Sequence, residues 1–290
     1  VSASRSSIYS TRSNPAARMA SAASRIAMRS DWPARMSSAA AVIAVTDGMR
    51  NDILRGYPTI GADRVTVIYN GIDLEAWRPV TDAAVLAEHG IDPARPSVVF
   101  VGRITRQKGL PYLLRAVATL DPAIQIILCA GAADTPEILA EVEAGVAALR
   151  AERDGVVWIE RHLPRHDLSA ILTAATVFVC PSVYEPLGIV NLEAMACETA
   201  VVGSATGGIP EVVEDGITGR LVPIDQVQDG TGTPVDPDQF VAALARVLAE
   251  TLADPDAAAR MGRAGRERAE RQFASGAIAR QAEALYRSLI

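Results

Sequence analysis

The chain has 290 residues, of which 49% are hydrophobic and 21% are charged, and its formal net charge is -6. These values are typical of a folded globular protein that buries a sizeable core in one large or two medium domains. The acidic balance argues against a general nucleic-acid binder, and no apolar run approaches the ~20 residues that span a bilayer.

The three cysteines, Cys129, Cys180 and Cys197, lie in apolar contexts and show no paired spacing. They are expected to be buried, reduced thiols of a cytoplasmic protein. The histidines, at positions 89, 162 and 166, form no recognisable metal-binding spacing. We therefore expect neither a metal nor a bound cofactor.

Residues 1–35 are expected to be disordered or poorly packed. The first thirty of them include many Ser and Arg and no Asp or Glu, a composition shared by transit peptides and disordered tails. Periodic patterns begin after this segment. They predict a strand at 41–45, a helix at 46–54 with Thr46 as its cap, and a second strand at 65–69.

From residue 97 the pattern alternates regularly between short apolar runs and amphipathic stretches. Strands are predicted at 98–101, 124–128, 156–159, 177–180, 200–202 and 219–222. Helices are predicted at 110–120, 136–151, 167–174, 187–196, 238–252, 257–272 and 278–289. This alternation predicts a doubly wound parallel sheet, which binds ligands beyond the carboxyl ends of its strands.

The stretch from residue 177 to 193 joins a buried strand to the start of a helix. Val177–Cys180 is apolar and β-branched, and Pro181 ends it. The helix that follows would offer free amide donors at the positive end of its dipole, from Leu187, Gly188, Ile189 and Val190. This arrangement predicts an anion site suited to a phosphate. Glu193, about one and a half turns inside the helix, would bind a sugar attached to that phosphate.

Glu185 and Glu193 are separated by seven residues and resemble the E-x7-E signature of retaining glycosyltransferases built from two facing Rossmann domains. The surrounding text, YEPLGIVNLEAMAC followed by TAVVGSATGGIPEVVEDGITGRLV, is similar to family 4 of these enzymes, and most to the actinobacterial glycogen synthase type. The alternative is an ordinary buried strand and helix with two incidental surface glutamates. The length of the matching context favours the glycosyltransferase.

The resemblance covers about residues 36–290 and implies an α/β chain of the GT-B type. It implies one complete C-terminal Rossmann-like domain and the remnant of an N-terminal one. The segment NGIDLEAWRP is similar to the hinge after the first domain. The expected parts are the remnant at 36–72, the hinge or linker at 73–96, the nucleotide-sugar-binding domain at 97–270, and a helix at 271–290 that packs back toward the N-terminal domain.

The loop after the first strand of this domain reads GRITRQKG and carries Arg103 and Lys108. Two cations at a strand's carboxyl end can neutralise a departing diphosphate without a metal. By resemblance, both fall where the family has its diphosphate-binding Arg and Lys, whereas Arg106 lacks a match and is expected to face solvent. The alternative is a solvated surface turn, but pairing with Glu185 and Glu193 favours the phosphate role.

Two further loops are candidates by resemblance. Residues 160–163 fall where the family binds the nucleobase, so the donor-binding candidates include Arg161, His162 and Leu163, although such contacts are usually made by the main chain. The segment TGGIPE at 206–211 resembles a glycine-rich turn near the donor sugar, and ordinary turn chemistry is its alternative.

The resemblance implies transfer of glucose, with retention, from ADP-glucose to an α-1,4-glucan or a small acceptor such as a sugar phosphate. The catalytic candidates are Glu185, Arg103 and Lys108. Glu185 would hold the reacting sugar and Glu193 the ribose. The Arg103–Lys108 pair, with the helix amides, would hold the diphosphate. One residue departs from the family, since Glu198 stands where Gly or another small residue is common.

Two other interpretations stay open at this point. One is another family 4 transferase with a lipid or small-molecule acceptor, and the other is a non-catalytic nucleotide-binding module. Only the last strands of the N-terminal domain are recognisable, so we expect an N-terminally truncated fragment that holds a nucleotide but does not transfer glucose. The residues do not fix an oligomeric state.

Overall fold

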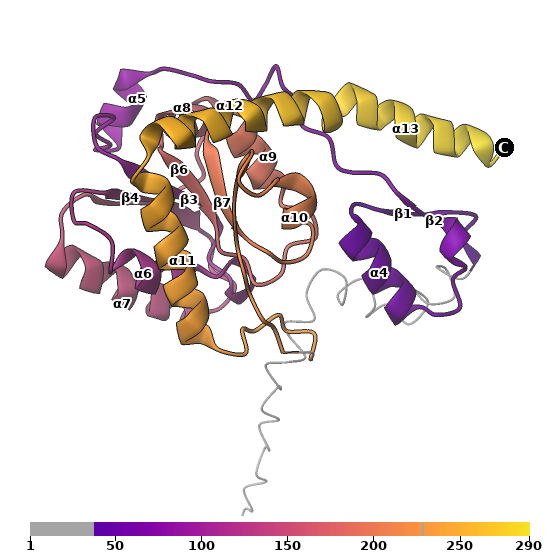
Figure 1. Cartoon of the computed structure of the whole chain (residues 1–290), viewed down its shortest axis with the longest axis horizontal. Coiled ribbons are helices and arrows are strands. Elements are labelled where there is room, and N and C mark those ends of the chain that lie inside the picture. Colours follow the sequence, from indigo (N-terminus) through magenta and orange to yellow (C-terminus); the bar gives the residue numbers. More distant parts are fainter. Residues whose placement is uncertain (1–37, 228) are drawn as a thin grey trace, which may run out of the picture.

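A computed structural model of the chain describes residues 38–227 and 229–290. The segment 1–35, predicted to be disordered, lies outside the described residues. The described part is built around a six-stranded, all-parallel sheet with a small αβ unit beside it (Figure 1). The predicted α/β class with a doubly wound parallel sheet is therefore confirmed.

The large sheet has the strand order β5-β4-β3-β6-β7-β8. Its strands are β3 (Ser97–Arg103), β4 (Gln125–Gly131), β5 (Val156–Ile159), β6 (Val177–Cys180), β7 (Ala200–Ser204) and β8 (Gly219–Val222). The chain winds from β3 outward through β4 to β5, and then returns to place β6 on the other side of β3. The winding reverses between β3 and β6, where such sheets open a ligand crevice.

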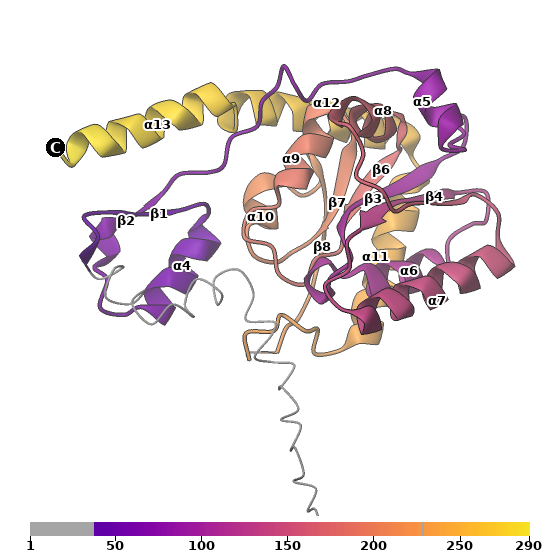
Figure 2. The same ribbon diagram turned by 180° about the vertical axis from the view of Figure 1, so that it is seen from behind.

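Helices cover both faces of the sheet (Figures 1 and 2). One face packs against α6 (Leu110–Val117), α7 (Pro136–Glu152) and α11 (Pro237–Leu252). The other face packs against α8 (Arg165–Ala174), α9 (Ile189–Ala196), α10 (Ile209–Val212) and α12 (Pro255–Gln272). Strand residues divide alternately between the two cores, as Val98 and Phe100 do on one side and Val99 on the other.

The small unit contains β1 (Val42–Ala44), α4 (Asp47–Gly56), the short helix η1 (Ala62–Arg64) and β2 (Val65–Val67). Its two strands pair in parallel, and it has a small core of its own around Ala44, Ile60 and Val65. The predicted strand, helix and strand are all present. The hydroxyl of Thr46 caps α4 as predicted, since its oxygen accepts from the Met49 amide at 3.0 Å.

The segment that was predicted as a plain linker contains a helix, α5 (Ala83–Glu88). The Asp82 carboxylate caps it by accepting from the amides of Ala84 and Val85 at 3.0 and 3.2 Å. A second difference concerns α9, which was predicted from Leu187 and begins at Ile189. Gly188 has a φ of 85°, a left-handed conformation that stops the helix from extending further back.

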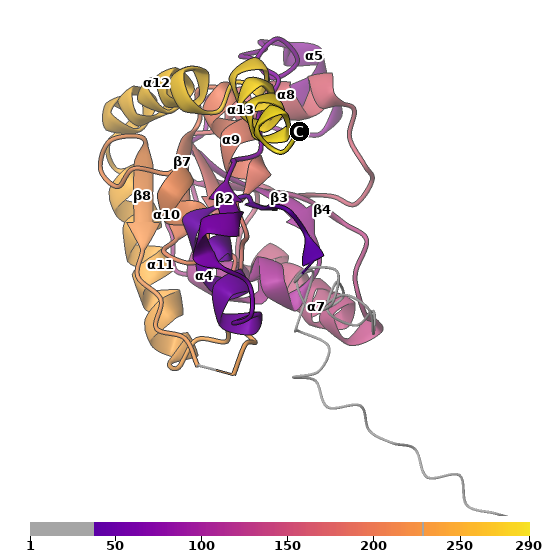
Figure 3. The same cartoon turned by 90° about the vertical axis from the view of Figure 1, so that its right-hand side faces the viewer.

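The last helix, α13 (Ser275–Ser288), continues from α12 and extends beyond the large sheet toward the small unit (Figures 1 and 3). The junction between α12 and α13 contacts the end of the small unit, where the Ile72 amide donates to the Phe273 carbonyl at 2.7 Å. The Tyr69 and Phe273 rings meet edge to face at 5.3 Å. Among the described helices, none combines the length and apolar character needed to cross a membrane.

Candidate active site

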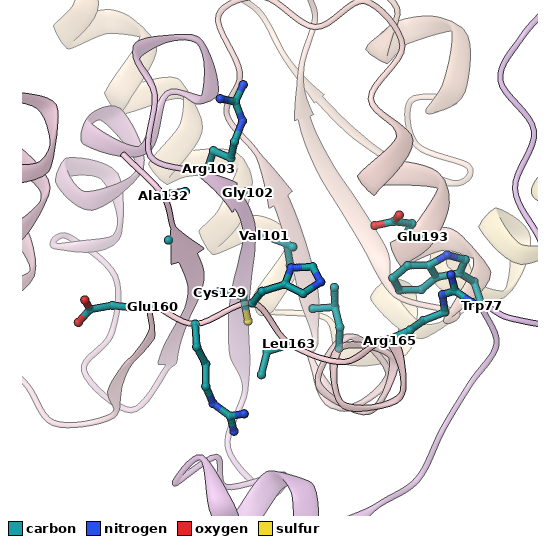
Figure 4. Close-up of a pocket in the computed structure, with 14 residues that line it drawn as sticks. Trp77, Val101, Gly102, Arg103, Cys129, Ala132, Glu160, Leu163, Arg165 and Glu193 are labelled. Atoms are coloured by element: carbon teal, nitrogen blue, oxygen red, sulfur yellow. The ribbon is translucent and has the colours of Figure 1, made fainter. Parts of the chain in front are cut away.

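A cavity of about 560 Å³ opens at the carboxyl ends of β3, β4 and β5 (Figure 4). Five of the predicted site residues line it, namely Arg103, Arg161, His162, Leu163 and Glu193. They come from the end of β3, from the loop after β5 and from α9, and only the winding of the sheet brings them together. This volume is of the size that ligand pockets for small molecules have.

Glu193 lies at one end of the cavity beside Trp77 and Arg165 (Figure 4). Burial raises the pKa of its carboxyl group to about 7, while the nearby Arg165 and Lys108 oppose that rise. The Arg165 guanidinium lies 5.8 Å from the centre of the Trp77 ring. Glu193 is thus a carboxylate in a partly apolar wall, able to accept hydrogen bonds from ligand hydroxyl groups.

Glu185 and Lys108 form a partly buried ion pair just outside the cavity lining. The Lys108 Nζ lies 2.6 Å from Glu185 Oε2, and the Ser182 hydroxyl donates to the same oxygen at 3.2 Å. Glu185 is only 7% exposed. Burial is the largest influence and lowers the pKa of Lys108, but the attraction and hydrogen bond of Glu185, together with Cys180, raise the net pKa, so the ammonium keeps its charge at neutral pH.

The local backbone explains how Lys108 reaches this position. Thr105 caps the short helix η2 (Arg106–Lys108), and Gly109 follows with a φ of 68°. A Cβ atom at Gly109 would lie 1.9 Å from the Pro181 carbonyl oxygen, so the loops after β3 and β6 pack backbone to backbone. This close approach requires glycine.

The N-terminus of α9 faces the same loops. The Asn191 amide donates to the Gly188 carbonyl at 2.9 Å. The amides of Gly188, Ile189 and Val190 come before it in the chain and have no carbonyl of the helix to donate to. Leu187 is buried, so only its backbone could serve a ligand. Asn191 is fully buried, and neither polar atom of its side chain has a partner within the described residues.

Two predicted donor-binding arginines have carboxylate partners. Arg103 lies 2.9 Å from Asp134, which follows β4, and Arg161 lies 2.7 Å from Glu88 at the end of α5. All four side chains are well exposed, so these pairs are weak and exchangeable. Arg106, predicted to face solvent, is exposed and pairs with Glu141.

Sequence reasoning missed three contributors to this region. Ser182, which follows the Pro181 that ends β6, was given no role in the site, although its hydroxyl donates to Glu185. Arg165 has no motif of its own, and Trp77 lies inside the NGIDLEAWRP segment, which was assigned only to the hinge. Ser182 carried a usable signal, because it lies three residues before Glu185 in a tight loop, and so did Trp77 through its place in the hinge segment. Within the described residues, no cluster of three or more His, Cys, Asp or Glu side chains could hold a metal ion.

Comparisons with known proteins give the family. A family model described as "Glycosyl transferases group 1" matches residues 95–250, and one described as "Glycosyltransferase Family 4" matches residues 7–76. The chain belongs to the group 1 glycosyltransferases. The Lys108–Glu185 pair and every cavity-lining residue except Trp77 fall inside the first of these two matches, and the second match begins within the undescribed N-terminal segment.

Curated relatives of this glycosyltransferase are named alpha-maltose-1-phosphate synthase. The protein of Mycolicibacterium smegmatis is 52% identical over 249 residues, and that of Mycobacterium tuberculosis is 54% identical over the same length. Each match covers 85% of this chain and 62% of the relative. The chain thus spans about three fifths of the length of these curated relatives. The predicted glycosyltransferase is confirmed, but these relatives do not specifically support a glycogen synthase.

Among solved structures, sucrose-phosphate synthase from Thermosynechococcus elongatus is similar to this glycosyltransferase with a TM-score of 0.73 and 32% identity. The match covers 89% of this chain and 60% of that one. The predicted GT-B fold is confirmed, with a C-terminal Rossmann-like domain and a partial N-terminal one. The roles assigned to individual residues remain proposals.

Proposed function

We propose that this chain is the donor-binding part of a retaining glucosyltransferase that uses ADP-glucose and forms α-maltose 1-phosphate. The observation that carries the proposal is the partly buried Lys108–Glu185 pair, which lies at the switch point between β3 and β6 and beside a cavity of nucleotide size. The substrate class rests on the identity of more than 50% with α-maltose-1-phosphate synthases over 249 residues.

The diphosphate would lie between Arg103, Lys108 and the amides from Leu187 to Val190. Charge accumulates on the leaving phosphate as the bond from the anomeric carbon breaks, so cations fixed beforehand lower the barrier. Lys108 is charged and held by Glu185, and Arg103 can exchange the exposed Asp134 for a phosphate. No metal is needed in this scheme.

The rest of the donor would extend into the cavity. Glu193 would accept hydrogen bonds from the ribose hydroxyls, and the main chain at Arg161, His162 and Leu163 would bind the adenine. Glu185 would hold the hydroxyls of the reacting glucose. In the transfer, the bond from the anomeric carbon to the diphosphate breaks and a bond to the acceptor oxygen forms on the same face, while the acceptor's proton passes to the leaving phosphate.

The acceptor follows from the chemistry of the product. α-Maltose 1-phosphate contains two glucose units and one phosphate, so a single glucosyl transfer forms it from a glucose phosphate. This is the sugar-phosphate acceptor of the sequence analysis rather than its α-1,4-glucan. A cytoplasmic location is part of the proposal, because Cys129, Cys180 and Cys197 are free thiols.

A transfer assay with the full-length enzyme tests the proposal. ADP-glucose and UDP-glucose are each offered with glucose 1-phosphate, glycogen or no acceptor, and the products are separated by charge and size. A phosphorylated disaccharide formed from ADP-glucose is the expected result. Transfer to glycogen alone, or a preference for UDP-glucose, would overturn the acceptor or the donor part respectively.

A further inference from the structure

A glutamate of the TGGIPE segment, Glu211, bonds the large domain to the small N-terminal unit. The Glu211 Oε2 accepts from the Asp47 amide at 2.8 Å and its Oε1 accepts from the Gly48 amide at 2.9 Å. These are the first two amides of α4, which no intrahelical carbonyl can satisfy. The Tyr69 hydroxyl adds a third hydrogen bond to Glu211 Oε2 at 3.2 Å.

A carboxylate in this position is favoured by charge as well as by hydrogen bonding, because the N-terminus of a helix is the positive end of its dipole. Burial and the neighbouring Glu211 both raise the pKa of Tyr69, which keeps its hydroxyl protonated as a donor. The Glu211 carboxylate accepts from the first two amides of α4, and the Thr46 hydroxyl accepts from the third, that of Met49.

The same region bonds directly to the backbone next to Glu185. The Thr46 hydroxyl donates to the Pro186 carbonyl at 2.8 Å, and the Gly208 amide donates to the Glu185 carbonyl at 2.8 Å. A Cβ atom at Gly207 would lie 2.0 Å from the Glu185 carbonyl oxygen, so the turn has no room for a larger residue. Three segments are thus in mutual contact, namely the start of α4, the Glu185–Pro186 backbone and the Gly207–Gly208 turn.

The far end of this connection is fixed in the large domain. Arg268 of α12 donates to the backbone carbonyls of Glu211 and Val212 at 2.9 Å each, and pairs with Glu214 at 3.2 Å. The backbone of Glu211 is therefore held by Arg268 in the large domain. Its side chain reaches α4, which lies beside α10 (Figures 1 and 3).

We propose that Glu211 is a positioning residue that ties α4 to the Glu185 loop and so holds Glu185 in its working orientation. The contact joins the small unit to the large domain that carries the site. This inference rests on the proposed function only for its consequence in catalysis. The contact itself can be measured without any transfer reaction.

Hydrogen exchange of the 290-residue chain tests the contact. Glu211→Ala should speed exchange of the α4 amides at Asp47 and Gly48 by at least tenfold, and Glu211→Gln should have a smaller effect because one acceptor oxygen is kept. The control is Glu214→Ala, which removes an Arg268 partner that does not touch α4. Unchanged α4 exchange in Glu211→Ala, or equal acceleration in Glu214→Ala, would overturn the contact.

Kinetics of the full-length enzyme test the positioning role. Glu211→Ala should lower kcat at least tenfold while the affinity for ADP stays within threefold, because the cavity residues do not depend on α4. An unchanged kcat would overturn the role. If the unmodified enzyme transfers no glucose while Glu211→Ala still loosens α4, then the proposed function fails and the contact between α4 and Glu211 stands.

Discussion

At the scale of single residues, the pair between Lys108 and Glu185 joins the two loops that would surround a donor diphosphate. The loops follow β3 and β6, which are neighbours in the sheet although 77 residues separate the two side chains. Removing either partner leaves the other charge buried and unpaired, so both loops would rearrange.

Lys108→Ala in the full-length enzyme is expected to lower kcat by about 10²–10³-fold, because charge on the leaving phosphate grows toward the transition state. Steady-state kinetics measure the effect. The matched control is Arg106→Ala, which removes a cation from the same short helix that points to Glu141 instead. If Lys108→Ala and Arg106→Ala have equal turnover, Lys108 does not bind the leaving group.

Glu193 should make both stability and nucleotide binding depend on pH. Its pKa in the folded chain is about 7, raised by burial from 4.5. The folded state therefore holds the proton more tightly, and the stability that this provides is present below pH 4.5 and lost as the pH rises through 7.

Glu193→Gln should remove this loss of stability with rising pH, because an amide side chain does not titrate in this range. Between pH 5 and pH 8 the variant should gain on the order of 2 kcal/mol over the unmodified chain in the free energy of unfolding, measured with denaturant. It should also bind ADP more weakly at pH 8, because a carboxylate acceptor is gone. A parallel pH dependence in both proteins would show that Glu193 does not titrate in this range. Glu152→Gln, at an exposed helix end, is the control.

At the scale of elements, the end of α9 explains the residue that departs from the family pattern. The Glu198 amide donates to the Met195 carbonyl and the Thr199 amide donates to the Ala194 carbonyl. These two bonds close the helix, and the left-handed residue at its end is Glu198 itself. Glu198 has a φ of 61°, a conformation that favours glycine. The Gly that the family resemblance leads us to expect here would have a backbone reason, and Glu198 lies there under strain.

Glu198→Gly should raise the free energy of unfolding by about 0.5–1 kcal/mol, since relief of left-handed strain exceeds the added flexibility of the unfolded chain. Glu198→Ala removes the same side chain but keeps the Cβ atom, so it should give no gain. Denaturant midpoints of the three proteins decide the matter. A stabilised alanine variant would mean that the charge of Glu198, rather than its backbone, sets the stability.

At the scale of the whole molecule, the residues assigned to the diphosphate and ribose lie between Arg103 and Glu193, inside one large domain with its own cores on both sheet faces. Such a domain is expected to fold and bind its nucleotide independently. Transfer also needs an acceptor held against the anomeric carbon with water excluded.

The 290-residue chain should therefore bind ADP by calorimetry and yet show no glucosyl transfer above background with radiolabelled ADP-glucose. Both measurements use one preparation, and Lys108→Ala, which removes the central cation of the site, is the control for specific ADP binding. Transfer at a rate typical of enzymes would show that the described parts suffice. Absence of ADP binding would show that the site needs more than this domain.

The sequence by itself determined the order of strands and helices, the parallel sheet, and the two candidate loops. These follow from local causes: a buried strand needs a β-branched apolar run, and a helix end needs a cap or a glycine. The family resemblance then supplied roles for Arg103, Lys108, Glu185 and Glu193.

Only the tertiary structure decided which of these groups meet. Lys108 binds Glu185 because the winding of the sheet places β3 beside β6, and Glu193 meets Arg165 because α9 and α8 pack on one face. The contact of Glu211 with α4 spans more than 160 residues. No local pattern encodes such pairs, because they depend on how whole elements pack rather than on the residues beside them in the chain.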